Sequence, residues 1–335
     1  MKLEIGQLER RIQAGLIRKQ TKGDLSIYSY TEKCTFEMAW DKYTERSRGL
    51  ILDFTGKVVA LPFSKFWNVG EKCCPALPKR ASFKAYSKID GSLGIIFHHG
   101  GRWRVATRGS FDNDYTRWAE ANMPDLSNFP TYWTVMAEIC MPSDLDGMPR
   151  AVKHEPGLYY LGATDLYQIN GVNDGDVCPS TSAHLWKGPI AESLLGAWSI
   201  DQLVRNAKHS AGIEGWVIRF DNGLRVKIKT AWYLQLFRAV SCLNEKHLKE
   251  LMEKVGINEC LQSFPEELRE EAEALATEIR DRFEARREQI MKAFVENYHA
   301  DRKTFALRIL NHPERSYLFL IYDGKSIDSK LLEAC

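Results

Sequence analysis

Apolar and polar residues alternate in two adjoining segments near residue 220, and this pattern predicts a β-hairpin. In segment 224–229, Leu, Val and Ile alternate with one Arg and two Lys. Segment 214–220 is rich in β-branched and aromatic residues, and Asn222-Gly223 separates the two runs. Asn-Gly in that position is a strong signal for a tight hairpin turn. Because successive side chains point to opposite faces of a strand, the three cations of the second segment are expected on one face.

The register of this hairpin decides on which face Glu214 lies. A two-residue loop pairs Ile218 with Lys227 and Trp216 with Lys229, and it places Glu214 on the cationic face. A three-residue loop with a bulge places Glu214 on the opposite face. If Glu214 and the cations act together in a binding site, they must share one face, and the two-residue loop is then expected. The alternative is a solvated edge strand with ordinary polar alternation.

The same two periodicities predict further elements along the first two thirds of the chain. Strands, several of them joined by glycine turns, are expected at 25–30, 48–54, 57–63, 93–97, 102–107, 133–139 and 158–166. Helices are expected at 2–19, 111–121 and 191–208, and a loop at 169–187. Hairpin-connected strands with separate helices indicate the α+β class, with antiparallel sheets and flanking helices.

After residue 232 the pattern becomes helical. Segment 233–255 is periodic and rich in Leu, Lys and Glu. Between Leu268 and Phe294, apolar residues follow a 3.6-residue period. We therefore expect two domains, 1–232 and 233–335, of which the second is mostly helical.

Smaller features of the C-terminal third leave alternatives open. Residues 263–266 resemble a helix-capping box with proline in the first turn. Arg286 and Arg287 interrupt the apolar stripe, where it would face solvent or a ligand. Segments 303–310 and 317–322 are apolar and compatible with either helix or strand.

Composition and charge are those of an ordinary globular protein and exclude a general polyanion-binding field. Of 335 residues, 44% are hydrophobic and 27% are charged, and the net charge is +2. Any polyanion site must therefore be a local patch. The N-terminus lacks the apolar core of a signal peptide, and no apolar run reaches the ~20 residues that span a bilayer. We therefore expect a cytoplasmic protein with no membrane partner.

Cysteine and histidine usage gives no sign of a structural metal. None of the eight cysteines forms a C-x-x-C pair, and Cys73 and Cys74 are adjacent. This usage indicates reduced thiols rather than zinc ligands or a disulfide framework. His98 and His99 lie in a predicted turn, where neighbouring side chains point apart, so we expect no metal there.

The segment 87–94, Ser-Lys-Ile-Asp-Gly-Ser-Leu-Gly, carries the main candidate chemistry. Lys88 stands two residues before an Asp-Gly turn, a pattern that by itself is typical of an exposed turn lysine. Further along the chain come Glu138, Glu214 and the hairpin lysines Lys227 and Lys229. Their order favours a second interpretation, in which all of them line one phosphate-binding pocket.

A lysine acts as a nucleophile only when its amine is neutral. The usual lysine pKa is near 10.4, so about one amine in a thousand is neutral at pH 7.4. Partial burial and nearby cations lower this pKa, and Lys227, Lys229 and a bound metal would provide the cations around Lys88. The same two lysines can neutralise a triphosphate and its pyrophosphate leaving group.

Carboxylates, a glycine and aromatic rings complete the candidate set. Glu138 and Glu214 offer hard oxygen atoms that can hold Mg²⁺ through water or accept ribose hydroxyls. Gly91 lets the backbone approach a nucleotide closely. An aromatic residue in a strand more often packs in a core, but four are candidates for stacking on adenine. They are Phe66, Tyr159, Tyr160 and Trp216.

Together these segments resemble the phage-type RNA ligase 1 family of ATP-dependent RNA ligases. This family lies within the covalent nucleotidyltransferase superfamily of ligases and mRNA capping enzymes. The run Lys88-Ile89-Asp90-Gly91-Ser92 resembles its nucleophile motif, and the resemblance covers residues 25–232. Further similar segments are Arg48-Gly49, Lys65-Phe66-Trp67-Asn68, Thr107-Arg108-Gly109-Ser110, Val135-Met136-Ala137-Glu138, Glu214 to Ile218 and Leu224 to Lys229.

Two positions depart from the family pattern. Arg108 stands where relatives can carry lysine. Ala137 precedes Glu138, where Gly or Phe is more usual, so the register of that motif is the least secure. The helical periodicity after Tyr233 also argues against the β-barrel OB domain that follows the last motif in DNA ligases and capping enzymes.

The resemblance implies a fold and a set of site residues. It implies a nucleotidyltransferase (adenylyltransferase) domain at 1–232, and a helical domain at 233–335 as a candidate RNA-specificity module. The implied catalytic residues are Lys88, Lys227, Lys229 and Glu214. The implied cofactor-binding residues are Arg48, Lys65, Phe66, Asp90, Gly91, Arg108, Glu138 and Tyr159, and the implied metal ligands are Glu138 and Glu214.

The implied reaction joins a 5′-phosphate and a 3′-hydroxyl RNA end, with ATP and Mg²⁺ or Mn²⁺. Lys88 attacks the α-phosphate of ATP, AMP then passes to the 5′-phosphate end, and the 3′-hydroxyl displaces AMP. The implied substrates are RNA ends, with tRNA among the candidates, in RNA repair. A kinase-phosphatase that prepares the ends is a candidate partner. We expect a monomer in the cytoplasm, which for a phage-encoded protein is that of the host.

Two alternatives remain at this stage. One is a DNA ligase or another nucleotidyltransferase, including one that uses GTP. The other is a non-catalytic RNA-binding protein with a relict pocket. The intact set of Lys88, Glu214, Lys227 and Lys229 argues against the second.

Overall fold

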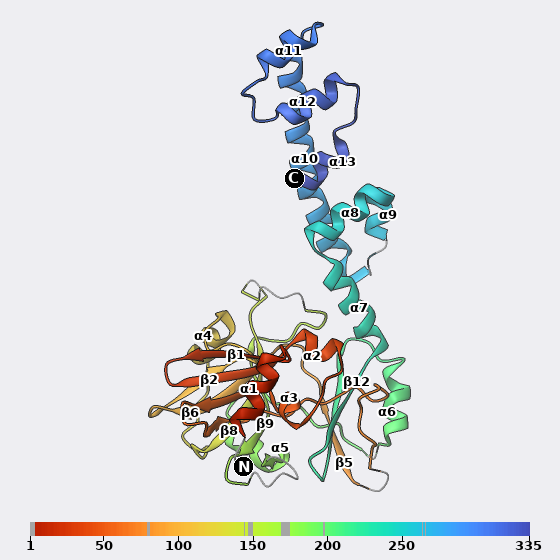
Figure 1. Ribbon diagram of the computed structural model, residues 1–335. Helices are drawn as coiled ribbons and strands as arrows, with labels where there is room; N and C mark the ends of the chain where they lie inside the picture. The colour runs from red at the N-terminus through yellow and green to blue at the C-terminus, as the bar shows by residue number, and fades with distance from the viewer. Residues whose placement is uncertain are drawn as a thin grey trace. The chain divides into compact units, whose positions relative to one another are not determined.

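The computed structural model describes residues 4–78, 81–143, 145–146, 150–168, 175–196, 198–262, 264 and 266–335. The chain divides into two compact units, Met1–Leu234 and Gln235–Cys335. The expected domain boundary, after residue 232, lies two residues before this division. Figure 1 labels helices and strands of the two units.

The described part of the first unit contains three antiparallel sheets. The first has the order β1 (Ile17–Lys22), β2 (Leu25–Tyr30), β3 (Arg48–Asp53) and β4 (Val58–Ala60). The second has the order β10 (Asp176–Val177), β9 (Gly157–Asp165), β8 (Trp133–Cys140), β6 (Ser92–His99) and β7 (Arg102–Ala106). The third has the order β12 (Arg225–Lys229), β11 (Gly215–Phe220) and β5 (Phe83–Ser87).

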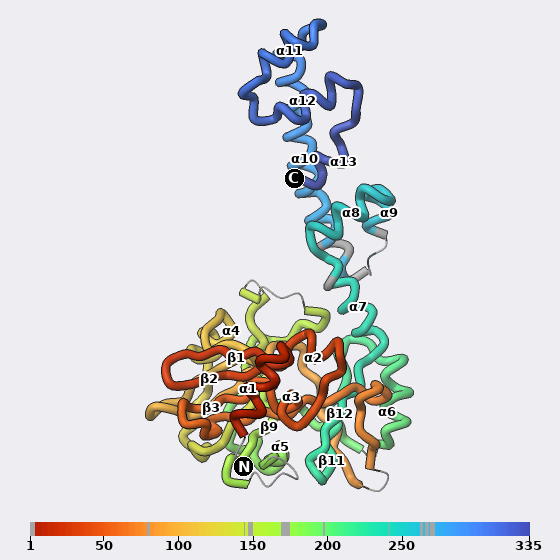
Figure 2. Tube along the Cα trace, viewed as in Figure 1, coloured from red at the N-terminus to blue at the C-terminus, as the bar shows by residue number. Residues whose placement is uncertain are grey.

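Apolar faces of the first two sheets pack on each other. Ile27 and Ile51 of the first sheet share a buried cluster with Ile95, Phe97 and Ala106 of the second. The third sheet pairs strands that are far apart in sequence. Its β5 lies beside β11, with Ser87 opposite Trp216, and Figure 2 shows the two segments running together. This pairing brings the residue after β5 close to the residue before β11.

Short helices cover the sheets of the first unit. They are α1 (Ile5–Gln13), α2 (Glu32–Phe36), α3 (Lys42–Arg46), α4 (Asp114–Ala121), α5 (Pro179–Ser182) and α6 (Ile200–Ala207), with a 3₁₀ turn at Ala183–Leu185. Leu8 of α1 is fully buried against the first sheet. Leu203 and Ala207 of α6 pack on the third sheet. The α+β class predicted from the sequence is confirmed.

Two predicted helices were too long. The helix expected at 2–19 ends at Gln13, because Gly15 adopts a positive φ of 72° and the chain then enters β1. The helix expected at 191–208 begins only at Ile200, where Ser199 caps its first turn. The expected loop at 169–187 contains β10 and α5 in its described part, 175–187.

The register predicted for the 214–229 hairpin was wrong. Val217 pairs with Lys227 and Gly215 with Lys229, so the loop has three residues rather than two. Gly223, at a φ of 85°, closes the loop by donating its N–H to the carbonyl of Phe220. The expected alternation along β12 holds, because Val226 and Ile228 are buried while the cations between them are partly exposed.

The second unit is helical throughout its described elements, as predicted. Helix α7 (Ala231–Cys242) crosses the division between the units. It is followed by α8 (Glu245–Val255), α9 (Ile257–Gln262), α10 (Glu266–Asn297), α11 (Arg302–Arg308), α12 (Arg315–Tyr322) and α13 (Asp328–Ala334). The two segments left open between helix and strand are therefore helices. The capping box predicted at 263–266 has no structural counterpart to compare, because its key positions 263 and 265 lie outside the described residues.

The arginines that interrupt the stripe of α10 have partners within the second unit. Arg286 forms an ion pair with Glu314 at 3.1 Å, and Arg287 forms one with Asp328 at 3.1 Å. These contacts tie α10 to neighbouring segments, so the interruption marks an internal contact rather than a ligand-binding face. Among the described residues, no helix is long and apolar enough to cross a membrane. All eight cysteines are free thiols.

Candidate active site

Three strand ends of the third sheet converge on one carboxylate. Lys88 directly follows β5, Glu214 directly precedes β11, and Lys229 ends β12. The amine of Lys88 lies 2.9 Å from Oε2 of Glu214, and the amine of Lys229 lies 2.9 Å from Oε1. Glu214 is 2% exposed, and each lysine side chain is 21% exposed. A buried carboxylate therefore holds two candidate catalytic amines in fixed positions.

Gly215 makes this arrangement possible despite the three-residue loop. Strict alternation would turn Glu214 away from Lys227 and Lys229, but Gly215 has a φ of +140°, a value that side-chain-bearing residues rarely adopt. A Cβ at this position would lie 2.0 Å from the carbonyl oxygen of Ile228. The backbone carbonyl of Gly215 also accepts the N–H of Lys88 at 2.9 Å. The glycine thus breaks the alternation and turns Glu214 back toward the lysines.

A cavity of about 210 Å³ opens beside Lys88 and is lined mainly by cations. Its charged lining residues are Arg48, Lys65, Lys88, Arg108, Glu138, Lys227 and Lys229. We call this the phosphate cavity, because such a density of positive charge suits a polyphosphate. Six cations face one another here against a single lining carboxylate, so an anionic ligand would relieve their mutual repulsion.

The surroundings of Lys227 in the phosphate cavity lower its pKa. Burial, followed by the positive charges of Lys65, Lys229 and Lys88, lowers the pKa of Lys227 to about 7. The sequence had suggested such a depression for the nucleophile Lys88. In the structure Lys88 contacts Glu214 directly, whereas Lys227 lies among cations and over the ring of Phe66 at 5.8 Å.

Burial also shifts the charged groups across the cavity. It raises the pKa of the Glu138 carboxyl, against the opposing effects of Lys88 and Arg48. It lowers the pKa of the Arg48 guanidinium, which lies 5.5 Å from the centre of the Phe66 ring. The ring of Phe66 therefore faces two cations, which disfavours the stacking role proposed for it from the sequence.

Asp90 and Gly91 lie behind Lys88 rather than in the lining of the described cavities. Oδ2 of Asp90 accepts the backbone N–H groups of Ala151 and Val152, both at 3.1 Å. A Cβ on Gly91 would lie 2.7 Å from Cγ of Glu138, so glycine is required for packing on β8. In this structure both residues position the lysine turn, and direct contact of either with a cofactor remains a prediction.

A second cavity, of about 440 Å³, lies on the other side of Lys88 and contains Tyr159. Its lining combines Tyr159, His154 and Ile213 with Glu214 and Pro189. We call it the Tyr159 cavity. An aromatic face, apolar groups and a few polar atoms are typical of a pocket for a planar base.

Two of the aromatic candidates are core residues. Tyr160 is 1% exposed and stacks on Trp186 at a ring distance of 5.6 Å. Trp216 is 7% exposed and packs in the third sheet's cluster beside Ile218. Neither can stack on a ligand without leaving its core, so these two candidates are excluded and Tyr159 is retained.

Several residues near the nucleophile were missed from the sequence. Tyr30 lines the phosphate cavity, and its ring lies 4.9 Å from the guanidinium of Arg108. Tyr233 donates to Oδ1 of Asp90 at 3.4 Å and lies 4.6 Å from the amine of Lys229. Arg150 donates to the carbonyl of Gly91 at 2.7 Å. For Tyr233 the only signal in the sequence was its closeness along the chain to Lys229, and there was none for Tyr30 or Arg150.

The donor set suits a divalent cation that is shared with a substrate. Among the described residues, no cluster of three or more His, Cys, Asp and Glu side chains could hold a metal by itself. Mg²⁺ is usually held by one or two carboxylates together with substrate phosphates and water. Glu138 and Glu214 provide two carboxylates close enough to influence each other's charge. These residues therefore fit Mg²⁺ as a partner of a bound polyphosphate.

Comparison with known proteins adds a family and a fold. Residues 46–233, more than half of the chain, match the T4-type RNA ligase 1 family, described as RNA ligase. A protein of Rhodothermus phage RM378 named RNA ligase is 22% identical over 384 aligned residues, covering 91% of this chain and 86% of the relative. RNA ligase 1 of bacteriophage TS2126 is 26% identical over 258 residues, covering 69% and 61% respectively.

A solved structure shares the fold. An archaeal ATP-dependent RNA ligase superposes with a TM-score of 0.51 at 14% sequence identity, covering 95% of this chain and 87% of that one. At this sequence identity, the similarity shows only that the two chains share a fold. The chemistry follows from the residues of the site.

Proposed function

This chain belongs to the T4-type RNA ligase 1 family, and from that premise we propose that it is an ATP-dependent ligase that joins 5′-phosphate and 3′-hydroxyl ends of RNA. The observation that carries the proposal is the pair of 2.9 Å contacts that Lys88 and Lys229 make with the buried Glu214, next to a cation-lined cavity. A nucleophile, a positioned carboxylate and a polyphosphate-binding surface meet in one place.

The proposed first step uses the two cavities that share Lys88. The nucleoside of ATP occupies the Tyr159 cavity and its phosphates occupy the phosphate cavity, so that the α-phosphate lies at Lys88. The amine of Lys88 attacks that phosphorus, the bond to the β-phosphate oxygen breaks, and pyrophosphate leaves among Lys65, Lys227 and Arg108. The nitrogen of Lys88 releases a proton to water as its bond to phosphorus forms.

The later steps use the same residues. The 5′-phosphate of the RNA attacks the phosphorus of lysyl-AMP, which returns the electron pair to the Lys88 amine. A 3′-hydroxyl then attacks the activated 5′ end, and AMP leaves. Glu138 and Glu214 would hold Mg²⁺ or Mn²⁺, which neutralises phosphate charge when bound. Arg48 and Lys65 would carry phosphate charge in all three steps.

The wider setting is also part of the proposal. RNA ends in repair, tRNA among them, are the proposed substrates. A kinase-phosphatase that converts broken ends into 5′-phosphate and 3′-hydroxyl is the proposed partner activity. We propose a monomer that acts in the cytoplasm, or in the host cytoplasm for a phage-encoded protein.

Intact mass spectrometry after incubation with ATP and Mg²⁺ tests the first step. The protein should gain the mass of one AMP, and added pyrophosphate should remove it. Lys88→Ala should gain nothing. Lys84→Ala is the matched control, because Lys84 is an exposed lysine on β5, the strand that Lys88 follows, and it should gain AMP normally.

The second half of the test identifies the polynucleotide. The AMP-loaded protein should seal 5′-phosphorylated single-stranded RNA. Sealing of nicked duplex DNA alone would identify a DNA ligase instead. If protein pretreated with pyrophosphate gains no nucleotide from ATP or GTP, the catalytic proposal fails and a binding protein with a relict pocket takes its place.

A further inference from the structure

Three cavities of the first unit lie in a row and share their walls. Lys88 and its neighbours Ser87 and Ile89 line both the Tyr159 cavity and the phosphate cavity. Phe63, Lys65 and Phe66 line both the phosphate cavity and a third cavity of about 490 Å³. Among the described residues, none lines both the first and the third. The phosphate cavity is therefore the middle compartment, and the third cavity adjoins it at the wall away from the nucleoside side.

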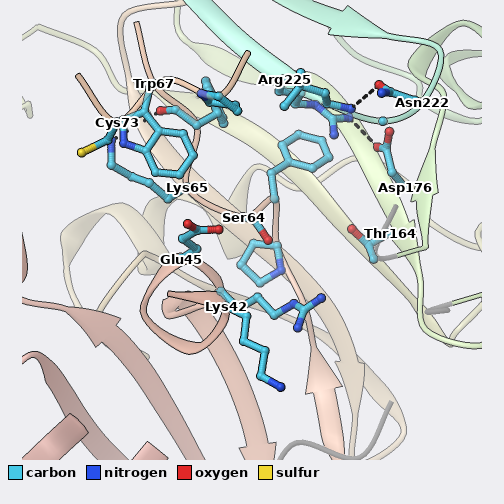
Figure 3. A pocket seen from close by; sticks show the side chains of 17 residues that line it. Lys42, Glu45, Ser64, Lys65, Trp67, Cys73, Thr164, Asp176, Asn222 and Arg225 are labelled. Atoms are coloured by element: carbon cyan, nitrogen blue, oxygen red, sulfur yellow. Dashed lines mark hydrogen bonds and ion pairs between the residues drawn. The ribbon is translucent and has the colours of Figure 1, made fainter. Parts of the chain in front are cut away.

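The third cavity has the size and charge of a nucleotide site. Its volume falls within the ~300–1,000 Å³ usual for small-molecule pockets. Its lining includes four cations and two carboxylates, which are Lys42, Arg46, Lys65, Arg225, Glu45 and Asp176. Figure 3 shows the cavity with Lys65 and Trp67 along one side and Arg225 and Asp176 along the other. The excess of positive charge favours an anionic ligand, and the aromatic residues offer surface for a base.

Two polar side chains that line this cavity differ in whether their hydrogen-bonding groups have partners. Arg225 is held in place, because its guanidinium pairs with Asp176 and lies 3.7 Å from the centre of the Phe63 ring. The indole N–H of Trp67 is different. Trp67 is 9% exposed, and within the described part of the chain no acceptor reaches its Nε1. A buried donor without a partner is costly, and because Trp67 lines the cavity, a ligand acceptor would satisfy this donor once the ring turns toward it.

Ligase chemistry determines which ligand fits beside the phosphate cavity. In phosphoryl transfer the attacking and leaving atoms lie roughly in line on opposite sides of the phosphorus. When lysyl-AMP reacts, the leaving atom is Nζ of Lys88. The attacking phosphate must therefore approach from the side away from Lys88. Of the two neighbouring compartments, the third cavity lies at the wall that Lys88 does not line.

We propose that the third cavity binds the 5′-terminal nucleotide of the RNA strand that receives AMP, which we call the donor strand. This inference rests on the proposed ligase function. The donor's 5′-phosphate lies at the wall formed by Lys65 and Phe66, and its first sugar and base occupy the cavity. Lys42 and Arg46 face the following phosphate, and an oxygen of the nucleotide accepts the N–H of Trp67.

The step served by this site balances without a further reactant. An oxygen of the 5′-phosphate forms a bond to the phosphorus of AMP, and the bond from that phosphorus to Nζ of Lys88 breaks. The leaving nitrogen takes up a proton from water and becomes the free amine of Lys88. The product is an RNA end that carries AMP through a pyrophosphate linkage.

Lys42→Glu tests the site, with Lys57→Glu as the matched control. Both lysines are exposed, but Lys42 lines the third cavity, whereas Lys57 lies in the turn before β4. Each protein is first loaded with AMP, which reports the proposed function, and is then mixed with 5′-phosphorylated single-stranded RNA. In Lys42→Glu, lysyl-AMP should form at the wild-type rate, while the RNA concentration for half-maximal AMP transfer should rise about three- to tenfold. Lys57→Glu should match the wild type in both.

A second variant probes the unpaired donor. Trp67→Phe keeps an aromatic ring and removes only the N–H group. AMP transfer from the loaded protein to RNA should slow, with a raised half-saturating RNA concentration, and Trp67→His, which restores a ring N–H, should recover part of the loss.

The outcomes separate the two proposals. If the wild type forms no lysyl-AMP, the ligase function fails. If all variants form lysyl-AMP and transfer it to RNA with the same concentration dependence, the third cavity does not bind the donor strand. Ligation of chemically pre-adenylated RNA at varied concentrations of each strand gives a further check. An effect of Lys42→Glu confined to the strand with the 3′-hydroxyl would overturn the assignment to the donor.

Discussion

The amine of Lys88 lies 2.9 Å from Oε2 of Glu214, although 126 residues separate the two in the chain. The contact exists because β5 and β11 are neighbours in the third sheet, with Lys88 following one strand and Glu214 preceding the other. The second carboxylate oxygen holds Lys229 at the same distance. One buried charge therefore sets the positions of two amines, and its removal should affect both.

Glu214→Gln should lower the rate of lysyl-AMP formation by about a hundredfold or more, because the two amines lose their shared anion. Quench-flow measurement of AMP incorporation gives the rate. Glu32→Gln, at an exposed position on α2, is the control and should react like the wild type. Wild-type incorporation in Glu214→Gln would show that Glu214 plays no part in the first step.

Gly215→Ala should destabilise the protein by about 2–4 kcal/mol, because the new Cβ meets the carbonyl of Ile228 and the residue must hold a φ of +140°. Gly212→Ala is the matched control. Gly212 also has a positive φ, of 76°, but a Cβ there meets nothing within 4 Å. It should cost about 1 kcal/mol from backbone strain alone. Urea denaturation measures both, and equal losses would mean that the contact with Ile228 does not matter.

Lys227 should take up a proton when a triphosphate binds at pH 8. Its pKa of about 7 leaves the amine mostly neutral at that pH, and an adjacent phosphate raises the pKa, so binding draws in up to about one proton. At pH 6 the amine is already charged, and the uptake should be small. Calorimetric titration with an ATP analogue bridged by carbon between the α- and β-phosphates, in two buffers of different ionisation enthalpy, counts the protons.

Lys227→Arg is the control for proton uptake, because a guanidinium stays charged throughout this range. It should bind the analogue at pH 8 with little uptake. If wild type and variant take up the same number of protons at pH 8, another group is responsible.

Arg150→Ala should slow lysyl-AMP formation by about ten- to a hundredfold with little change in the ATP concentration needed for half-maximal rate. Arg150 donates to the carbonyl of Gly91 at 2.7 Å and to Oγ of Ser92 at 2.8 Å, and Asp146 accepts from its Nε at 2.9 Å. It therefore positions the turn that carries Lys88, and it lines neither the phosphate cavity nor the Tyr159 cavity. Arg150→Lys should recover only part of the rate, since lysine lacks the forked geometry.

Arg117→Ala serves as the control for Arg150, because Arg117 is an exposed arginine that pairs with Asp112 and Asp114 on the surface. Its rate should be that of the wild type. A loss in Arg150→Ala that appears mainly as weakened ATP binding would indicate a direct ligand contact instead of positioning.

Local pattern was sufficient to predict most elements of the fold. Strand β2 was placed at its observed bounds, and the apolar stripe from Leu268 to Phe294 became one helix, α10. Strand β2 buries apolar residues on both faces, with Leu25 and Ile27 in one cluster and Tyr28 in another, and α10 buries an apolar stripe, so both signals survive folding. The helix expected at 2–19 failed because a single glycine in a left-handed conformation, Gly15, redirects the chain into a strand. The pattern of polar residues after Gly15 does not show that the chain changes there from helix to strand.

The candidate site could be predicted as a set of residues but not as a geometry. Lys88, Glu214 and Lys229 were chosen together and do meet. The reason given was wrong, because the hairpin has a three-residue loop and Gly215 restores the position of Glu214. Arg150 could not have been chosen, since nothing local links it to Gly91. Long-range packing of a polar side chain on a backbone carbonyl leaves no periodic trace in the sequence.

The wall formed by Lys65 and Phe66 has a kinetic consequence. If the pyrophosphate of the first half-reaction and the RNA end of the second both occupy this side of the middle compartment, one must depart before the other can dock. Turnover would then follow a ping-pong scheme, with pyrophosphate competing against RNA for the AMP-loaded enzyme. A cell that hydrolyses pyrophosphate quickly would drive repair forward by clearing that passage.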